Sequence, residues 1–88
     1  MTVNDWESAM GTMRAAVIAV EDRLPPSDVD NVWELVEAGE PGVAFETLCT
    51  QLYEYDVAVP GPTLASLAEL GRYFKFDPKL WEILTAET

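Results

Sequence analysis

The sequence has no histidine, a single cysteine and only five Lys and Arg residues, against 16 Asp and Glu in 88 residues. Cys49 has no partner for an internal disulfide, so the fold needs no oxidising compartment. No stretch approaches the roughly 20 apolar residues of a membrane span. The N-terminal MTVNDWESAM also lacks the positive start and apolar run of a signal peptide. We therefore expect a cytoplasmic protein without a membrane segment.

The few bases are also unevenly placed along the chain. The segment from Leu24 to Gly71 contains nine carboxylates and no Lys or Arg. The formal net charge of −11 argues against nucleic acid or an anionic membrane as a direct partner, because both are polyanions that recruit basic residues. An acidic surface of this kind suits a basic protein.

Length and an apolar content of 49% suffice for one compact core, so residues 1–88 are expected to form a single helical domain. Apolar residues recur at spacings of three and four, which is typical of amphipathic helices. The sequence therefore predicts an all-α fold, a four- or five-helix bundle. The predicted core positions are Trp6, Met10, Met13, Val17, Val20, Leu24, Val29, Val32, Trp33, Val36, Phe45, Leu48, Cys49, Leu52, Leu64, Leu67, Ala68, Leu80, Trp81 and Leu84.

Capping residues and prolines predict the limits of the first two helices. Asn4 with Glu7 three residues later is a candidate capping pair for the first helix. The Pro-Pro pair at residues 25–26 should end that helix, because proline lacks the backbone donor that the helix needs. Ser27 is then the expected cap of the second helix.

Glycine and proline predict the later boundaries as well. Gly39 is the expected left-handed stop of the second helix, and Pro41 should begin the third. Residues 56–59 alternate for only four positions and have no obvious partner strand, so they are expected to form an extended connector whose valines enter the core. Pro62 should begin the fourth helix, and Asp77 with the following proline a short closing helix.

Carboxylates and tyrosines lie on the polar faces of the second and third predicted helices. Such acids are also typical of a face kept only for solubility. Aromatic residues among acids favour an interface, because it must desolvate area and also match a positive partner. The helical spacing predicts that Tyr53 is exposed and that Tyr55 leans towards the core. The candidate partner-binding residues are Asp30, Glu34, Glu37, Glu40, Glu46, Tyr53, Glu54 and Asp56.

The sequence favours a protein that acts without catalysis. It has no histidine, and Cys49 lies on an apolar stripe, where a buried and inert thiol is expected. No glycine-rich phosphate loop precedes a helix, and residues 28–31 (DVDN) lack the spacing and glycine of an EF-hand loop. We therefore expect no catalytic residue, no metal site and no cofactor.

One segment of the chain carries a family resemblance: residues 33–59, with the sequence WELVEAGEPGVAFETLCTQLYEYDVAV, followed by LASLAEL and PKLWEIL. It resembles the small immunity proteins of bacterial polymorphic toxin systems, of the Maf type and of contact-dependent inhibition. The shared pattern is an acidic helix, a Gly-Glu-x-Gly turn at residues 39–42, an Ala-Phe-Glu-x-Leu helix from Ala44, and an acidic and aromatic end at residues 52–54. The resemblance covers about the latter two-thirds of the chain.

This resemblance implies a monomeric antidote that forms a heterodimer with the catalytic domain of a cognate toxin inside the producing cell. Many such toxins are nucleases, whose substrate groove must be cationic to hold phosphates, and an anionic helix pair could cover that groove. The alternative is an acidic adaptor, or an anti-regulator that mimics DNA and occupies a transcription factor. The sequence does not separate these two functions.

Overall fold

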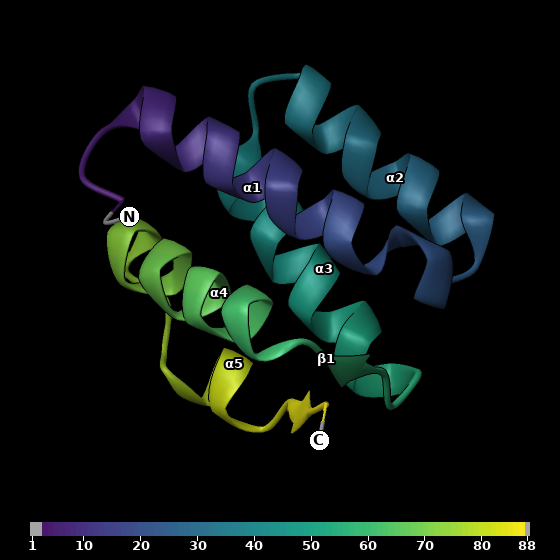
Figure 1. The fold of residues 1–88 in the computed structure, drawn as a ribbon. Coiled ribbons are helices and arrows are strands. Elements are labelled where there is room, and N and C mark those ends of the chain that lie inside the picture. The colour runs from purple at the N-terminus through teal and green to yellow at the C-terminus, as the bar shows by residue number, and fades with distance from the viewer. Residues whose placement is uncertain (1–2, 88) are drawn as a thin grey trace.

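The computed structural model describes residues 3–87, which form five α-helices, one 3₁₀ turn and two very short strands (Figure 1). The predicted all-α bundle is confirmed. No helix within these residues is both long enough and apolar enough to cross a membrane. In chain order the elements are α1 (Trp6–Val20), η1 (Glu21–Arg23), α2 (Pro26–Glu37), α3 (Pro41–Glu54), β1 (Ala58–Val59), α4 (Gly61–Phe74), α5 (Lys79–Glu82) and β2 (Thr85–Ala86).

Helix α3 lies at the centre of the bundle and contacts each of the other four helices. Helices α2 and α3 form an antiparallel hairpin, and α1 packs against α4 (Figure 1). The short α5 lies across the ends of α3 and α4. This arrangement leaves one long side of α2 facing solvent.

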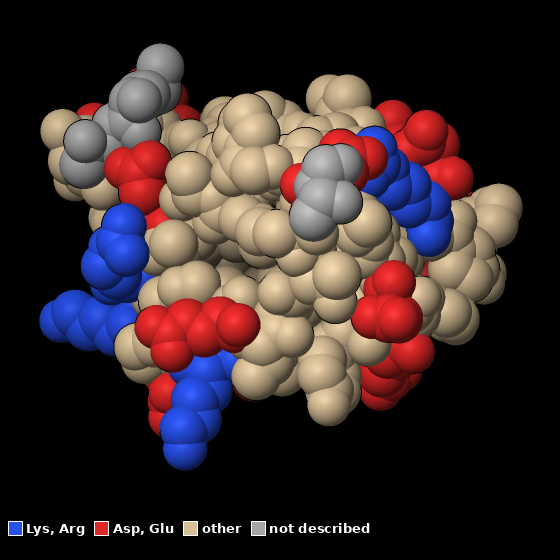
Figure 2. Space-filling view, turned by 60° about the horizontal axis from the view of Figure 1, so that its bottom comes forward, with Lys and Arg blue, Asp and Glu red and all other residues tan. Residues whose placement is uncertain are grey.

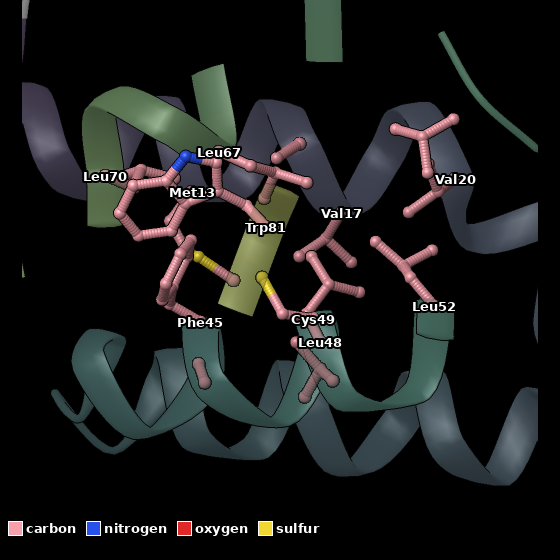
Figure 3. Packing of buried hydrophobic residues seen from close by; sticks show 14 of the residues in the cluster. Met13, Val17, Val20, Phe45, Leu48, Cys49, Leu52, Leu67, Leu70 and Trp81 are labelled. Atoms are coloured by element: carbon pink, nitrogen blue, oxygen red, sulfur yellow. The ribbon is translucent and has the colours of Figure 1, made fainter. Parts of the chain in front are cut away.

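The predicted apolar stripe of α3 forms the middle of the core. Phe45, Leu48 and Cys49 are fully buried, and Leu52 is 1% exposed. Figure 3 shows side chains of this stripe pointing towards those of α1. The Phe45 ring also contacts Trp81 of α5, with ring centroids 6.2 Å apart. Helix α3 therefore joins α1 to α5 through one continuous core.

Helix α1 begins and ends differently from the prediction. Its capping box is Asp5 with Ser8, not Asn4 with Glu7: the Ser8 amide donates to Asp5 Oδ1 at 2.8 Å, which lowers the pKa of Asp5. The helix stops at Val20, before any proline, and continues only as the 3₁₀ turn η1. Trp6 is 53% exposed, because it lies at the open end of the stripe.

Helix α2 also lacks the predicted cap. Pro26 occupies its first turn, and no side chain caps its N-terminus, so Ser27 does not have the predicted role. At its C-terminus the prediction is confirmed: Gly39 has φ +76°. The amide of Gly39 donates to Val36 O and that of Glu40 to Leu35 O, which is the paired pattern of a Schellman stop. Pro41 then begins α3, as predicted.

The prediction that residues 56–59 lack a partner strand is wrong. Ala58 and Val59 pair in parallel with Thr85 and Ala86, which lie beyond α5. The Thr85 hydroxyl donates to Asp56 Oδ1 at 3.1 Å, and the Glu87 amide donates to Val59 O at 2.8 Å. The partner was missed because it is far away in sequence. The valines at 57 and 59 are buried as predicted.

Arg23 binds both β1 and the residue that follows β2. Its Nη1 donates to the Ala58 carbonyl and pairs with Glu87 Oε1 at 3.0 Å. One guanidinium therefore connects η1, β1 and the residue after β2. The chain from 85 to 87 is held against the body of the protein by polar contacts, since both residues of β2 are exposed.

Helix α4 begins at Gly61, one residue before the predicted Pro62, and ends at Phe74. Leu67 is buried as predicted, but Leu64 and Ala68 are only partly buried. The prediction missed the fully buried Leu70 and also Gly71, which lies directly under the Trp81 ring. A start near Asp77 is confirmed for α5, since Asp77 Oδ1 accepts from the Lys79 amide at 3.0 Å.

Candidate protein-binding surface

All eight predicted partner-binding residues are exposed, but they do not form one continuous face. Asp30, Glu34 and Glu37 follow one another at spacings of four and three on α2. Because residues at these spacings lie on one side of a helix, the three carboxylates line up along α2. We call them, together with Trp33, the α2 acidic face.

The α2 acidic face contains a shallow, open hollow of about 620 Å³, lined by Asp30, Trp33, Glu34, Glu37 and Ala38. Trp33 is partly buried against the core, and its Nε1–H donates to Glu21 Oε1 at 3.3 Å. That hydrogen bond fixes the indole on the side of α2 that borders η1. Trp33 is only partly buried, in contrast to its predicted place in the core, and its spacing from Asp30 and Glu37 places it beside them on α2.

Helix α3 packs along a different side of α2. The Gln51 side-chain amide of α3 donates to the Asp28 carbonyl at 3.2 Å, and the Glu40 amide closes the turn onto Leu35. The α2 acidic face therefore points away from α3. Glu46, Tyr53 and Glu54 project from the outer side of α3 and are not part of the hollow.

A second hollow of about 340 Å³ lies between α3 and α5. It combines two acids with one base and with apolar side chains, and its lining residues are Glu46, Phe76, Asp77, Lys79, Leu80 and Ile83. Ile83 is 51% exposed there, and Tyr53 is 58% exposed on the same helix as Glu46. The exposure of Tyr53 confirms the prediction for that side chain.

The remaining predicted residues lie in turns. Glu40 is in the tight turn between α2 and α3, and Asp56 adopts φ 51° just after α3. The exposed Asp56 carboxylate accepts a hydrogen bond from the Thr85 hydroxyl, so it also stabilises the position of β2. Tyr55 is 50% exposed, and the prediction that it leans into the core is wrong, because α3 ends before it and the chain turns. A hydrogen bond to Asp28 and its charge raise the pKa of Tyr55.

No ion pair within residues 3–87 involves a carboxylate of the α2 acidic face. Within residues 3–87, the ion pairs are those of Arg23 with Asp22 at 4.0 Å and with Glu87 at 3.0 Å. In the view of Figure 2, Lys and Arg side chains form two separate groups with a broad, mostly uncharged area between them. The carboxylates of α2 thus face solvent without a cation from the described part of the chain.

Two observations concern metal ligands and the single thiol. No group of three or more His, Cys, Asp or Glu in residues 3–87 is arranged to hold a metal ion. Cys49 is fully buried, and its burial raises the pKa of the thiol to about 12, so the nucleophilic thiolate does not form near neutral pH. What the surface provides is negative charge beside an aromatic ring.

No protein-family model, curated protein or solved structure matches this chain. Its function is therefore inferred from the exposed side chains and from the resemblance of residues 33–59 described above.

Proposed function

We propose that this domain is an inhibitory protein of the immunity type, which binds a basic surface on the catalytic domain of a cognate toxin through the α2 acidic face. It acts by binding as one half of a heterodimer, and it carries out no chemistry itself. The observation that supports this proposal most directly is the open hollow that Asp30, Glu34 and Glu37 line together with Trp33, with no ion pair to a base within residues 3–87.

The charge pattern of α2 favours a partner over a surface kept for solubility. Asp30 and Glu34, and likewise Glu34 and Glu37, repel each other by a few tenths of a kcal/mol per pair on an exposed helix. A solubility role does not require these acids to cluster around an aromatic side chain. A cationic groove on a partner would remove the repulsion and would also bury apolar carbon of Trp33.

The combination of negative charge and an aromatic side chain supports both fast and tight binding. Complementary charge raises association rates towards roughly 10⁸–10⁹ M⁻¹s⁻¹ at low salt, which suits an antidote that must reach its toxin before damage occurs. Tight binding further needs desolvated aromatic anchors, because these dominate interface hot spots. Trp33 supplies such an anchor within the α2 acidic face, whereas the exposed Tyr53 lies on α3 outside it.

The test uses the toxin domain encoded beside the gene for this chain, purified and titrated calorimetrically with the wild-type protein and with Glu34→Lys/Glu37→Lys. We expect the double reversal to cost about 2–3 kcal/mol of binding free energy, which is about a 30- to 150-fold rise in Kd. The melting temperature should stay level or rise slightly, since the reversal makes positions 30 and 34 attract each other and puts positive charge near the negative C-terminal end of α2, while positions 34 and 37 still repel.

The matched control is Glu46→Lys/Glu54→Lys, which changes the net charge equally but lies on α3, outside the hollow. It should weaken binding far less than the reversal on α2. Equal losses for the two double variants would mean that only net charge is sensed, and would reject the α2 acidic face as the binding site. A neighbouring gene without a toxin domain, together with binding to a DNA-binding regulator, would favour the adaptor or DNA-mimic function.

A further inference from the structure

The hollow on α2 has two kinds of wall. One is the side chain of Trp33, and the other is the row of carboxylates at Asp30, Glu34 and Glu37. An indole has a single polar group, its N–H, which can only donate. In Trp33 this N–H is already bonded to Glu21 Oε1 at 3.3 Å. What Trp33 presents to the hollow is therefore aromatic carbon and no free hydrogen-bonding group.

The carboxylates contribute acceptors along the same side of the helix. With a rise of about 1.5 Å per residue, Asp30 and Glu34 lie about 6 Å apart along the axis, and Glu34 and Glu37 about 4.5 Å. None of them pairs with a base within residues 3–87. A ligand for this hollow must therefore be a cation that also has a surface able to lie against an aromatic ring.

Arginine meets both conditions better than lysine does. Its guanidinium is flat, stacks on aromatic faces and presents several donors in a fixed fork that two neighbouring carboxylates can accept. Lysine offers a compact and strongly hydrated charge, which gains less from a ring and cannot bridge carboxylates in the same way. The hollow is open to solvent on one side, so a side chain can enter it from a partner's surface without any rearrangement of α2.

We propose that the hollow lined by Trp33, Asp30, Glu34 and Glu37 is a receptor for one arginine side chain of the protein partner. This inference rests on the proposed function, because it names the group on the partner that the α2 acidic face recognises. The partner is thus one that presents an arginine on an exposed basic surface.

The experiment measures the indole N–H signals of the protein by NMR during titration with three short acetylated and amidated peptides. The peptides are Gly-Ser-X-Ser-Gly, with X as Arg, Lys or citrulline, the last being neutral and nearly the same shape as Arg. Trp33 reports on the hollow, while the exposed Trp6 and the buried Trp81 serve as internal references. Trp33→Phe assigns its signal, and circular dichroism verifies that the variant is folded.

We expect the arginine peptide to shift the Trp33 signal saturably, with the lysine peptide binding about three to ten times more weakly. The citrulline peptide should cause no saturable shift. In Glu34→Gln/Glu37→Gln the response to the arginine peptide should disappear, whereas Glu46→Gln/Glu54→Gln, an equal loss of charge outside the hollow, should keep it. Equal responses to the arginine and lysine peptides, or a larger shift at Trp6 than at Trp33, would overturn the proposal. These peptide comparisons need only the wild-type protein, so they hold even where a variant fails to fold.

The two proposals can fail separately. If charge reversal on α2 abolishes toxin binding but the peptides do not discriminate arginine, the function stands and the arginine receptor is wrong. If the arginine peptide binds selectively but no toxin domain does, the hollow is a receptor whose partner belongs to another class.

Discussion

Gly71 packs directly against the Trp81 ring, and its replacement gives a sharp test of the fold. A Cβ at this position would lie 2.0 Å from Cζ3 of Trp81, 2.4 Å from Cε3 and 2.6 Å from Cη2. Ordinary contact begins near 3.4 Å, so in Gly71→Ala the rigid indole must move as a whole. Trp81 is 8% exposed and packs edge-on against Phe45, which leaves it little room.

Two limits bracket the free energy of this change. Complete expulsion of the indole would expose about 150–250 Å², which corresponds to about 4–6 kcal/mol at about 25 cal/mol per Å². A partial shift within the core costs about 1–3 kcal/mol, as for other overpacked sites. Alanine returns about 1 kcal/mol through its higher helix propensity in the interior of α4. Because three ring atoms would lie within 2.6 Å of the new Cβ, the smallest shifts are excluded, and we expect Gly71→Ala to lower the free energy of unfolding by about 2–4 kcal/mol.

The measurement is urea denaturation followed by far-UV circular dichroism. The control is Gly11→Ala, inside α1 with nothing within 4 Å of the new Cβ, which should stabilise the protein by up to about 1 kcal/mol. In a Trp81→Leu background, Gly71→Ala should lose most of its effect, because the clashing ring is gone. A loss below about 0.5 kcal/mol in the wild-type background, or the same loss with and without Trp81, would refute this account of the packing.

Two further predictions concern the turn after α2 and the buried thiol. Gly39 has φ +76°, and nothing lies near the position of a Cβ there. Gly39→Ala should therefore lower the free energy of unfolding by about 1–2 kcal/mol through backbone strain alone, and Gly39→Asn should lower it less. Equal stability of the wild-type protein and both variants in urea would contradict this. Burial raises the pKa of Cys49 from 9.0 to about 12. Between these values the unfolded thiol loses its proton while the folded one keeps it, so stability should fall as pH rises, by up to about 1.4 kcal/mol per pH unit. Cys49→Ala should flatten this slope in denaturation curves from pH 8 to 11, and an unchanged slope would show that other groups cause it.

Features set by neighbouring residues were predicted correctly from the sequence. The apolar stripe of α3, the left-handed Gly39 and the start at Pro41 depend on spacings of a few residues and on backbone preferences. Cap identity was less predictable, because Asp5 and Asn4 are both good capping residues one position apart, and the geometry of the first turn decides between them.

Features that depend on distant parts of the chain could not be read from local patterns. The pairing of β1 with β2 and the contact of Gly71 with Trp81 require the whole bundle to be in place. The candidate site shows the same limit: each predicted residue is exposed, yet the hairpin sends Glu46 and Tyr53 to one face and Glu34 to another. Tyr55 was misplaced because helical spacing was extended past the last turn of α3.

The contacts of Arg23 have a consequence for the order in which the protein folds. Helical contacts close within a few residues, whereas the bond from Arg23 to Ala58 joins residues 35 apart and that from Thr85 to Asp56 joins residues 29 apart. Loops of this length close slowly compared with a helical turn, and the parallel alignment of β1 and β2 requires α4 and α5 to have docked first. Because both residues of β2 are exposed and pair with β1 only once α5 has docked, the segment from 85 to 87 should join the fold last and detach first. Amide hydrogen exchange at Glu87 would then report a local opening well below the free energy of global unfolding.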